Sequence, residues 1–282
     1  MSGFEVSEPI LSGPYDEPAE HWRIVEGEQP RREQGRRPAM YYYRPPGPVS
    51  EGDGDGLGTL IELKLVNRIR HRLEEWHAAG RPGVTRTTVE LLEYWTREGR
   101  QHRLFFAQRE AAETVIFLTE ARPDFRQGID IPLDEPSEER RAAGHTAFRR
   151  LACKMATGSG KTTVMAMLAA WSLLNKVNNR GDSRFSDVVL VVCPNVTIRS
   201  RLGELDPREG DASLYRTRDL VPQHVMADLT QGRVLITNWH VFEPQAVTPG
   251  GVSARVARAG VAVRTVETIT IGPRTTTARN RR

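Results

Sequence analysis

Met155-Ala156-Thr157-Gly158-Ser159-Gly160-Lys161-Thr162-Thr163 is the stretch around which the rest of this sequence is arranged. An apolar run, Leu151-Ala152-Cys153, precedes it and predicts a strand. The segment from Val164 to Lys176 follows it, with apolar residues at helical spacing, and predicts a helix. The order strand, glycine loop, helix is the setting in which many proteins bind phosphate groups.

The residue types in this loop suit a polyphosphate. Two glycines let consecutive backbone N–H groups turn inward around an anion, and the start of the helix adds partial positive charge. Lys161 is predicted to reach the β- and γ-phosphates of a nucleotide, and Thr162 to place its hydroxyl on a bridging magnesium ion. The predicted phosphate cradle consists of Thr157, Gly158, Ser159, Gly160, Lys161, Thr162 and Thr163.

The loop departs from the pattern G-x-x-x-x-G-K-[ST] at one position, because Met155 stands where the first glycine is expected. The alternative interpretation is a glycine turn before an ordinary helix. The apolar run, the glycines, the lysine and the threonine all agree with each other, so we favour the phosphate-binding interpretation.

Composition sets weaker limits. The chain has 282 residues, of which 38% are hydrophobic, enough for a core in only part of it. No apolar run approaches membrane-spanning length and the first residues lack the pattern of a signal peptide, so we predict a cytoplasmic protein without membrane contact. Cys153 and Cys193 both lie in apolar runs and are predicted to be core residues.

Charge is distributed unevenly along the chain. Residues 1–60 carry 11 acidic and 6 basic side chains, whereas residues 233–282 carry 8 arginines and 2 glutamates. This asymmetry favours nucleic-acid binding by the second half. The alternative is a genome-wide preference for arginine, since only four of the 40 basic residues are lysines.

Five segments are predicted from composition and periodicity. They are an irregular Gly- and Pro-rich arm at 1–58, a helical region at 59–122, a connection at 123–146, an α/β region at 147–248 and a basic loop or tail at 249–282. The arm holds Tyr41-Tyr42-Tyr43, which we expect to dock it locally.

Three helices are predicted in the helical region. The first spans about Ile61 to Ala79 and stops at Gly80-Arg81-Pro82-Gly83. The second begins near Thr87, with Thr87-Thr88-Val89-Glu90 as a capping box, and buries Leu91, Leu92 and Trp95. The third spans about Leu104 to Ala121 and contains Gln108.

Two strands are predicted after the phosphate loop. The run 187–195 is expected to be buried on both faces of a parallel sheet, with a short helix at 197–205 behind it, and 233–240 repeats the pattern. Because ligands gather at the carboxyl ends of parallel strands, Pro194, Asn195, Thr237 and Asn238 are expected to face the same side as the phosphate loop.

The residues at these strand ends suit a nucleic-acid backbone. Short amide and hydroxyl side chains and Arg199 are predicted to contact phosphates. The alternative is that Asn195 and Asn238 merely cap turns.

Several short sequence motifs resemble those of one family. Met-Ala-Thr-Gly-Ser-Gly-Lys-Thr at 155–162 looks like motif I of superfamily-two helicases, where the first glycine is commonly replaced. With Leu-Phe-Phe-Ala-Gln-Arg-Glu at 104–110 and Ile-Thr-Asn-Trp-His at 236–240, the chain resembles the restriction subunit of type III restriction endonucleases, over about residues 60–245.

The resemblance implies a P-loop RecA-like parallel sheet at 147–248, an incomplete first helicase domain preceded by the helical region. It implies ATP and Mg²⁺ as cofactors, movement along DNA, more specifically duplex DNA, and a methyltransferase subunit as partner. It also implies that Gln108 holds the adenine, because a glutamine amide both donates to and accepts from the base edge.

Hydrolysis in such enzymes needs a carboxylate at a strand end, and none is found after Thr163. We therefore expect a chain truncated before the Asp-Glu-x-His motif, which binds nucleotide with little turnover. The alternative is a standalone, non-hydrolysing module that binds nucleotide and nucleic acid. The sequence motifs that follow Lys161 argue against a third possibility, a small P-loop kinase.

Overall fold

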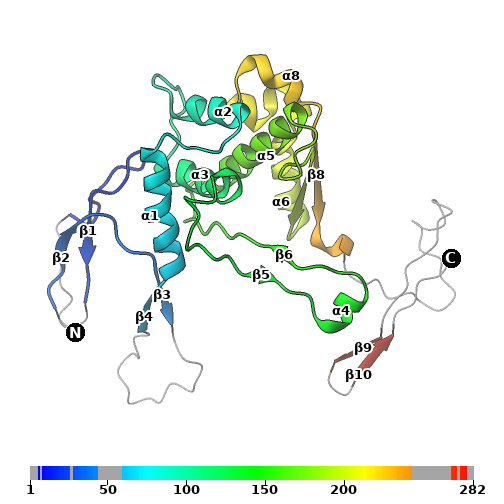
Figure 1. Cartoon of the computed structure of the whole chain (residues 1–282), viewed down its shortest axis with the longest axis horizontal. Helices are drawn as coiled ribbons and strands as arrows, with labels where there is room; N and C mark the ends of the chain where they lie inside the picture. The colour runs from blue at the N-terminus through cyan, green and yellow to red at the C-terminus, as the bar shows by residue number, and fades with distance from the viewer. Residues whose placement is uncertain are drawn as a thin grey trace. The chain divides into compact units, whose positions relative to one another are not determined.

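The computed structural model describes residues 6, 8–25, 28–43, 59–242, 268–271 and 274–277. The chain forms two compact units, one of Met1–Val189 with Glu204–Val234 and the other of Leu190–Gly203 with Leu235–Arg282. Helices dominate the first unit, and the strands of the described residues pair only into two-stranded sheets (Figure 1).

The core of the first unit is built around one helix, α5 (Lys161–Asn178), which begins directly after the phosphate loop. It packs against α2 (Arg86–Thr96), α3 (Phe106–Glu120), α7 (Leu214–Thr217) and α8 (Met226–Leu229), and α1 (Lys64–Ala78) packs on α3 (Figure 1). Because neighbours surround α5, its residues are buried on nearly every side, as expected for a helix that is apolar around most of its circumference. Its buried residues are Thr163, Val164, Ala166, Met167, Ala169, Ala170, Trp171, Leu173, Leu174 and Asn175.

The helices of the region 59–122 form largely where periodicity predicts them. Helix α1 begins at Lys64, because the residues before it form a strand, and it buries Leu73 and Trp76. Helix α2 buries Leu91, Leu92 and Trp95 as predicted. Its capping residue was wrongly predicted, since Thr85 caps it by accepting from the backbone N–H of Thr88 at 3.1 Å. Thr85 also carries a hydroxyl three residues before a backbone N–H of the first turn, so it can cap the helix in the way that was expected of Thr87.

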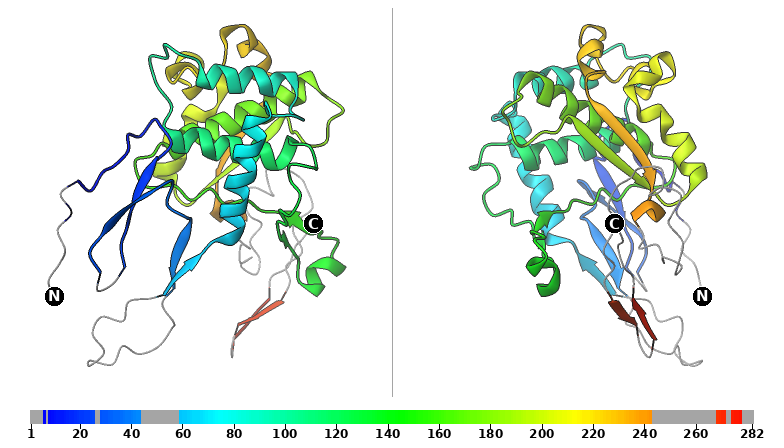
Figure 2. Two further views of the ribbon diagram at one scale, coloured as in Figure 1. Left: turned by 60° about the vertical axis from the view of Figure 1, so that its left-hand side comes forward. Right: turned by 90° about the vertical axis from the view of Figure 1, so that its right-hand side faces the viewer.

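The N-terminal arm is less irregular than predicted. Strand β1 (Glu20–Arg23) pairs antiparallel with β2 (Arg31–Gln34), and β3 (Met40–Tyr43) pairs antiparallel with β4 (Thr59–Glu62). Figure 2 shows both pairs extending from the helical part of their unit. The segment Tyr41–Tyr43 is held locally, as expected, but by the backbone pairing of β3 with β4, since the three tyrosine side chains are exposed.

The connection between α3 and the phosphate loop contains a small hairpin. Strand β5 (Leu133–Asp134) pairs antiparallel with β6 (Phe148–Arg149), and α4 (Glu138–Ala142) lies between them in sequence. The strand predicted at Leu151–Cys153 is absent. These residues are irregular and exposed. A strand of a parallel sheet is stable when neighbours pair with it, and no described strand pairs with this segment. Cys153 is consequently an exposed thiol rather than the predicted core residue, whereas Cys193 is buried as predicted.

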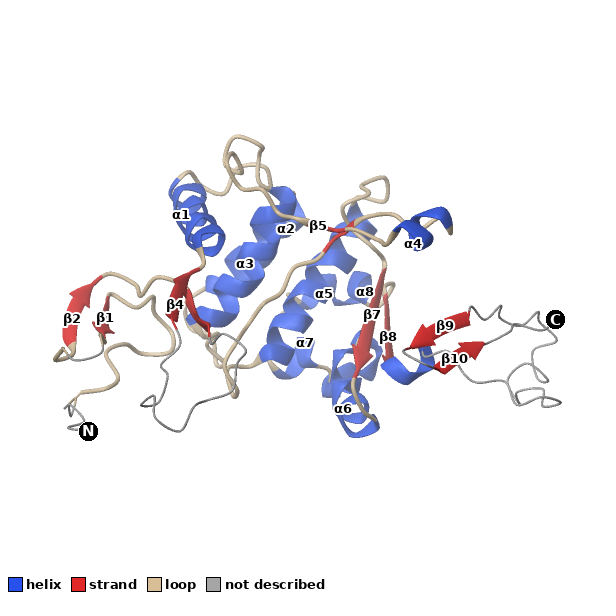
Figure 3. Cartoon of the chain, turned by 90° about the horizontal axis from the view of Figure 1, so that it is seen from below, coloured by secondary structure: helices blue, strands red, loops and turns tan. Residues whose placement is uncertain are grey.

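Strand β7 (Val188–Cys193) pairs with β8 (Arg233–Asn238) (Figure 3). The backbone N–H of Arg233 donates to the Asp187 carbonyl where the strands begin, and Trp239 Nε1 donates to the Pro194 carbonyl where they end. Starts lie beside starts and ends beside ends, so the two strands run in the same direction. The prediction that β7 is buried on both faces is wrong, because Val188, Leu190 and Val192 are exposed.

The remaining elements are short. Helix α6 (Val196–Arg201) follows β7 and continues into η1, as the short helix predicted at 197–205. Near the C-terminus, β9 (Thr268–Ile271) pairs antiparallel with β10 (Arg274–Thr277), where a loop or tail was predicted; the rest of 249–282 lies outside the described residues. The 3₁₀ helices are η1 (Leu202–Leu205), η2 (Pro207–Ala212), η3 (Gln223–Val225) and η4 (Trp239–Phe242).

Candidate functional site

The phosphate loop has the backbone shape that its glycines predict. Gly158 and Gly160 have φ angles of +81° and +79°, in the left-handed region that other residues avoid. Gly160 is also the N-cap of α5, and no side chain caps this helix. The first N–H groups of α5 therefore lack an intrahelical partner and lie at the positive end of the helix dipole. Such a helix start fits an anion.

Two side chains of the loop donate to one carbonyl oxygen. Ser159 Oγ donates to the Ala156 carbonyl oxygen at 2.6 Å, and Lys161 Nζ donates to the same oxygen at 2.8 Å. The ammonium of Lys161 is exposed and lies over the loop. A phosphate oxygen would be a stronger acceptor for this ammonium than a neutral carbonyl, because both partners would then be charged.

Gln108 lies against the phosphate loop although it is far from it in sequence. Its Nε2 donates to the Ser159 carbonyl at 3.1 Å, and its Oε1 accepts from the backbone N–H of Phe105 at 2.9 Å. The side chain is buried. The structure thus brings together the glutamine and the loop that the sequence picked out separately. Reading of a base by Gln108 stays a prediction.

The closeness of Gln108 gives Gly160 a second reason to be glycine. A Cβ at Gly160 would lie 2.0 Å from Gln108 Nε2, whereas a Cβ at Gly158 would meet nothing within 4 Å. We expect Gly160→Ala to lower the free energy of unfolding by about 1–3 kcal/mol from backbone strain alone, with the clash added to it. The displaced glutamine is also expected to weaken nucleotide binding, which calorimetric titration would measure.

Gly158→Ala is the matched control for this substitution. Both glycines have nearly the same positive φ, so the control carries the strain without the contact to Gln108. Equal losses of stability in the two variants would contradict the importance of this contact.

The residues predicted to contact nucleic acid all lie in the second unit. Asn195 caps α6, its Oδ1 accepting from the backbone N–H of Ile198 at 2.9 Å, so the capping alternative holds for its side chain. The carbonyl of Pro194 accepts from Trp239 Nε1 at 3.1 Å. Arg199 is exposed on α6.

The end of β8 is more enclosed than the start of α6. Thr237 and Asn238 are half-buried. Asn238 Oδ1 is enclosed and has no hydrogen-bond partner among the described residues. Whether any of these residues contacts a nucleic acid stays a prediction.

Neither of the two aspartates considered for hydrolysis lies at the carboxyl end of a strand. Asp187 precedes β7, and Asp206 Oδ1 caps η2 by accepting from the backbone N–H of Arg208 at 3.0 Å. In the described part of the chain, no three His, Cys, Asp or Glu side chains gather in a way that could hold a metal ion. The role of Thr162 as a magnesium ligand stays a prediction.

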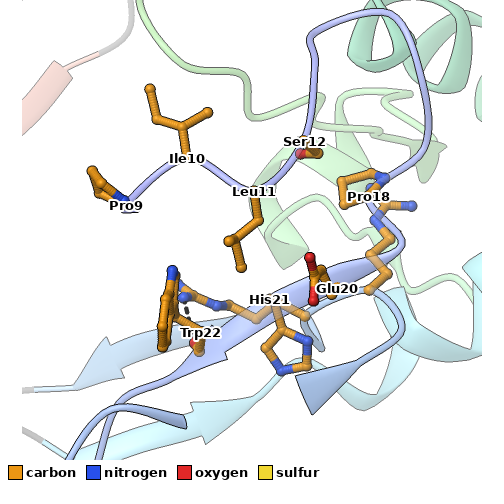
Figure 4. Close-up of a pocket in the computed structure, with 10 residues that line it drawn as sticks. Pro9, Ile10, Leu11, Ser12, Pro18, Glu20, His21 and Trp22 are labelled. Atoms are coloured by element: carbon orange, nitrogen blue, oxygen red, sulfur yellow. Dashed lines mark hydrogen bonds between the residues drawn. The ribbon is translucent and has the colours of Figure 1, made fainter. Parts of the chain in front are cut away.

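A cavity of about 380 Å³ lies elsewhere in the first unit, between the segment 9–12 and strand β1 (Figure 4). Leu11 points from this segment toward the hairpin, and Ile10 points away from it (Figure 4). None of the sequence-predicted site residues lines the cavity. Half of the residues that line the cavity are apolar, and Arg36 and Arg37 are among the others. Nucleotide binding at the phosphate loop stays a prediction, which the N–H donors and the ammonium of the loop favour.

Sequence reasoning missed the residues that hold the start of α3. Pro14, Tyr15 and Arg36 contact the helix within one turn of Gln108. No local pattern signals these contacts, because they join segments about 70 to 95 residues apart.

A left-handed glycine loop that opens a buried helix with lysine and threonine defines, as a class, a P-loop nucleotide-binding protein. The family described as type III restriction enzyme, res subunit, matches residues 101–241, which is half of the chain, and the chain belongs to this family. Membership implies a P-loop helicase-like fold and a nucleotide-binding module. No curated protein and no solved structure matches the chain. None of the helices in the described residues has the length and apolar character needed to cross a bilayer.

Proposed function

We propose that this chain binds ATP with Mg²⁺ and binds DNA, as the nucleotide-binding part of an ATP-dependent helicase or translocase. One observation carries the proposal: the left-handed glycine loop opens α5 with an exposed lysine, and Gln108 lies against that loop. Family membership supports ATP, Mg²⁺ and DNA at the level of the family.

Each residue of the loop has a role suited to its chemistry. The uncapped N–H groups at the start of α5 bind phosphate oxygens, and Lys161 neutralises phosphate charge once it leaves the Ala156 carbonyl. Thr162 is half-buried at the first turn of α5 and offers its hydroxyl to Mg²⁺, which prefers oxygen ligands. Thr157, Ser159 and Thr163 complete the cradle, and Gln108 reads the adenine edge.

Two features of the chain suit a polyphosphate, the uncapped start of α5 and the ammonium of Lys161. Glycine at position 160 also leaves room for Gln108 beside the loop, because a Cβ there would lie 2.0 Å from Gln108 Nε2. Mg²⁺ neutralises phosphate charge when bound with ATP. The chain itself supplies binding, orientation and one ammonium.

DNA is the nucleic acid we propose, and duplex DNA in particular. Arg199 and the backbone at Pro194, with Asn195, Thr237 and Asn238, form the proposed contact region for the phosphate backbone. A methyltransferase subunit is the proposed protein partner, by likeness to the family.

One observation favours a second candidate, a module that binds nucleotide without hydrolysing it. In the described residues after Thr163, Asp187 lies before its strand and Asp206 caps a 3₁₀ helix, so neither ends a strand beside the loop. A carboxylate at such a strand end orients the attacking water in hydrolysing relatives.

The experiment that tests the proposal measures binding and turnover together. The purified chain is titrated with Mg–ATP by calorimetry, and phosphate release is followed in the same preparation. We expect saturable binding and little turnover. Multiple turnover that Lys161→Ala abolishes would overturn the non-hydrolysing candidate, and the absence of any ATP binding would overturn the proposal as a whole.

For the DNA contact, we expect Arg199→Ala to weaken duplex binding to a similar degree for all sequences and to reduce the slope of log K against log salt by about one unit, because one phosphate contact is lost. Fluorescence anisotropy with a labelled duplex across a salt series measures this slope. Arg180→Ala is the matched control, because Arg180 is an exposed arginine outside the proposed region. An unchanged slope for Arg199→Ala would exclude a phosphate contact by this residue.

A further inference from the structure

The segment Pro14–Glu17 lies against the first turn of α3. The backbone N–H of Phe106 donates to the Pro14 carbonyl at 2.8 Å, and Arg109 Nη2 donates to the Tyr15 carbonyl at 2.7 Å. Phe106 N–H is one of the first donors of the helix, which have no intrahelical acceptor. The segment thus caps α3 from a distance of about ninety residues in sequence.

Side chains strengthen this attachment. The rings of Tyr15 and Phe105 lie 5.5 Å apart, and the guanidinium of Arg103 lies 4.4 Å from the centre of the Tyr15 ring. Contacts between aromatic rings at such distances contribute beyond the area that they bury, as do cations over ring faces.

A second attachment comes from the residue that follows the first hairpin. Arg36 binds Glu110 with both ends of its guanidinium, Nη2 donating to Oε2 at 2.6 Å, and it also lies over the ring of Phe106 at 5.1 Å. Burial lowers the pKa of Arg36, but the hydrogen bond and charge of Glu110 outweigh burial, so the net pKa is raised. Both side chains are about four-fifths covered, which makes this pair stronger than an exposed ion pair.

Both attachments surround Gln108. Phe105 donates its backbone N–H to Gln108 Oε1, and Glu110 follows two residues later on the same turn. The other end of the amide donates to Ser159 in the phosphate loop. A continuous set of contacts therefore runs from the N-terminal arm through the first turn of α3 to the loop.

We propose that Pro14–Glu17 and Arg36 form a specificity element of the nucleotide site, which fixes Gln108 and thereby determines how strongly the base contributes to binding. The inference rests on the proposed nucleotide-binding function. It assigns to the N-terminal arm a positioning role: the arm acts on the nucleotide through Gln108.

The test compares ligands with and without a base. Mg–ATP, Mg–GTP and Mg–tripolyphosphate are titrated into the full chain and its variants by calorimetry. We expect Arg36→Ala and Tyr15→Ala to weaken ATP binding at least about fivefold and to reduce the preference for ATP over GTP, a coupling of the size common between linked sites. Tripolyphosphate binding is expected to change less than about twofold, because it requires only the loop.

Two further variants make the test specific. Tyr15→Phe keeps the ring and is expected to retain the preference for ATP. Arg23→Ala removes an exposed arginine of the same hairpin, which pairs with Glu33 and not with α3, and it is expected to bind all three ligands like the unaltered chain. Circular dichroism confirms folding of each variant, and Tyr15→Ala provides the test if Arg36→Ala fails to fold.

Three results would overturn the inference. Equal weakening of ATP and tripolyphosphate binding in folded variants would show that the arm supports the whole loop and not Gln108 in particular. Unchanged binding of both ligands would show that the arm does not affect the site. Binding of neither ligand by the unaltered chain would overturn the proposed function itself, and the inference with it.

Discussion

Lys161→Ala is expected to weaken Mg–ATP binding by about 10- to 100-fold, because a hydrogen bond between charged partners contributes about 1.5–3 kcal/mol. The ammonium already lies over the loop, where it donates to the Ala156 carbonyl, so the substitution removes a charge from the proposed phosphate site. The fold is expected to be unaffected, since the side chain is exposed and donates to a carbonyl of the same loop. Calorimetric titration with Mg–ATP measures the loss.

Lys154→Ala is the matched control. It removes the same charge from an exposed position seven residues earlier, on the segment that leads into the loop. We expect this variant to bind ATP within about twofold of the unaltered chain, because a charge of this kind at the surface is screened by solvent and salt. Equal losses in the two variants would show that general charge, rather than the position of Lys161, governs binding.

Local signals in the sequence predicted the parts of the fold that depend on nearby residues. The helices α1, α2, α3 and α5 follow from apolar spacing and from stop signals such as Gly80. The left-handed glycines 158 and 160 follow from residue type, since few other residues adopt that conformation. These features depend on interactions within a few residues, which a sequence displays directly.

Features that depend on distant partners were not predictable in the same way. Leu151–Cys153 has the composition of a strand, but a strand forms only where another strand supplies hydrogen bonds, and none of the described strands does so here. The β3–β4 pair likewise joins segments on either side of a glycine-rich stretch. Composition alone cannot show such pairings.

The candidate site illustrates both cases. Residue type and order identified the loop and Gln108, and the structure places them in hydrogen-bond contact. Tyr15 and Arg36 have no distinctive local pattern, so their contacts with α3 emerged only from the structure. A glutamine is informative in sequence because its chemistry is specific, whereas a residue that acts through packing is identified by its neighbours.

The three helices that position the site share one buried polar network. Glu120, at the end of α3, accepts from Thr85 N–H at 2.8 Å, from Thr88 Oγ1 at 2.6 Å and from Trp171 Nε1 at 2.6 Å. Thr85 and Thr88 belong to the start of α2, and Trp171 belongs to α5. Asn175 extends the network by donating to Thr88 Oγ1 at 2.9 Å. The carboxylate thus joins the helix of Gln108 to the helix of Lys161.

Glu120→Ala is expected to lower the free energy of unfolding by about 3 to 5 kcal/mol, because three donors lose their acceptor and each orphaned buried donor costs about 1 to 3 kcal/mol. The side chain is 3% exposed, so water cannot readily replace it. Urea denaturation followed by circular dichroism measures the change. Glu98→Ala, at an exposed position between α2 and α3, is the control and is expected to change stability by no more than about 0.5 kcal/mol.

A double-mutant cycle with Trp171→Phe separates the network from simple loss of packing. Trp171→Phe removes one donor to Glu120 and keeps an aromatic ring in the core. If the network is cooperative, Glu120→Ala is expected to cost less in the Trp171→Phe background, with a coupling of about 0.5–3 kcal/mol between the two residues. Additive losses would show that Glu120 and Trp171 stabilise the fold independently. A coupling would mean that α3 and α5 hold their relative positions through this carboxylate, and hence that the spacing between Gln108 and the phosphate loop depends on it.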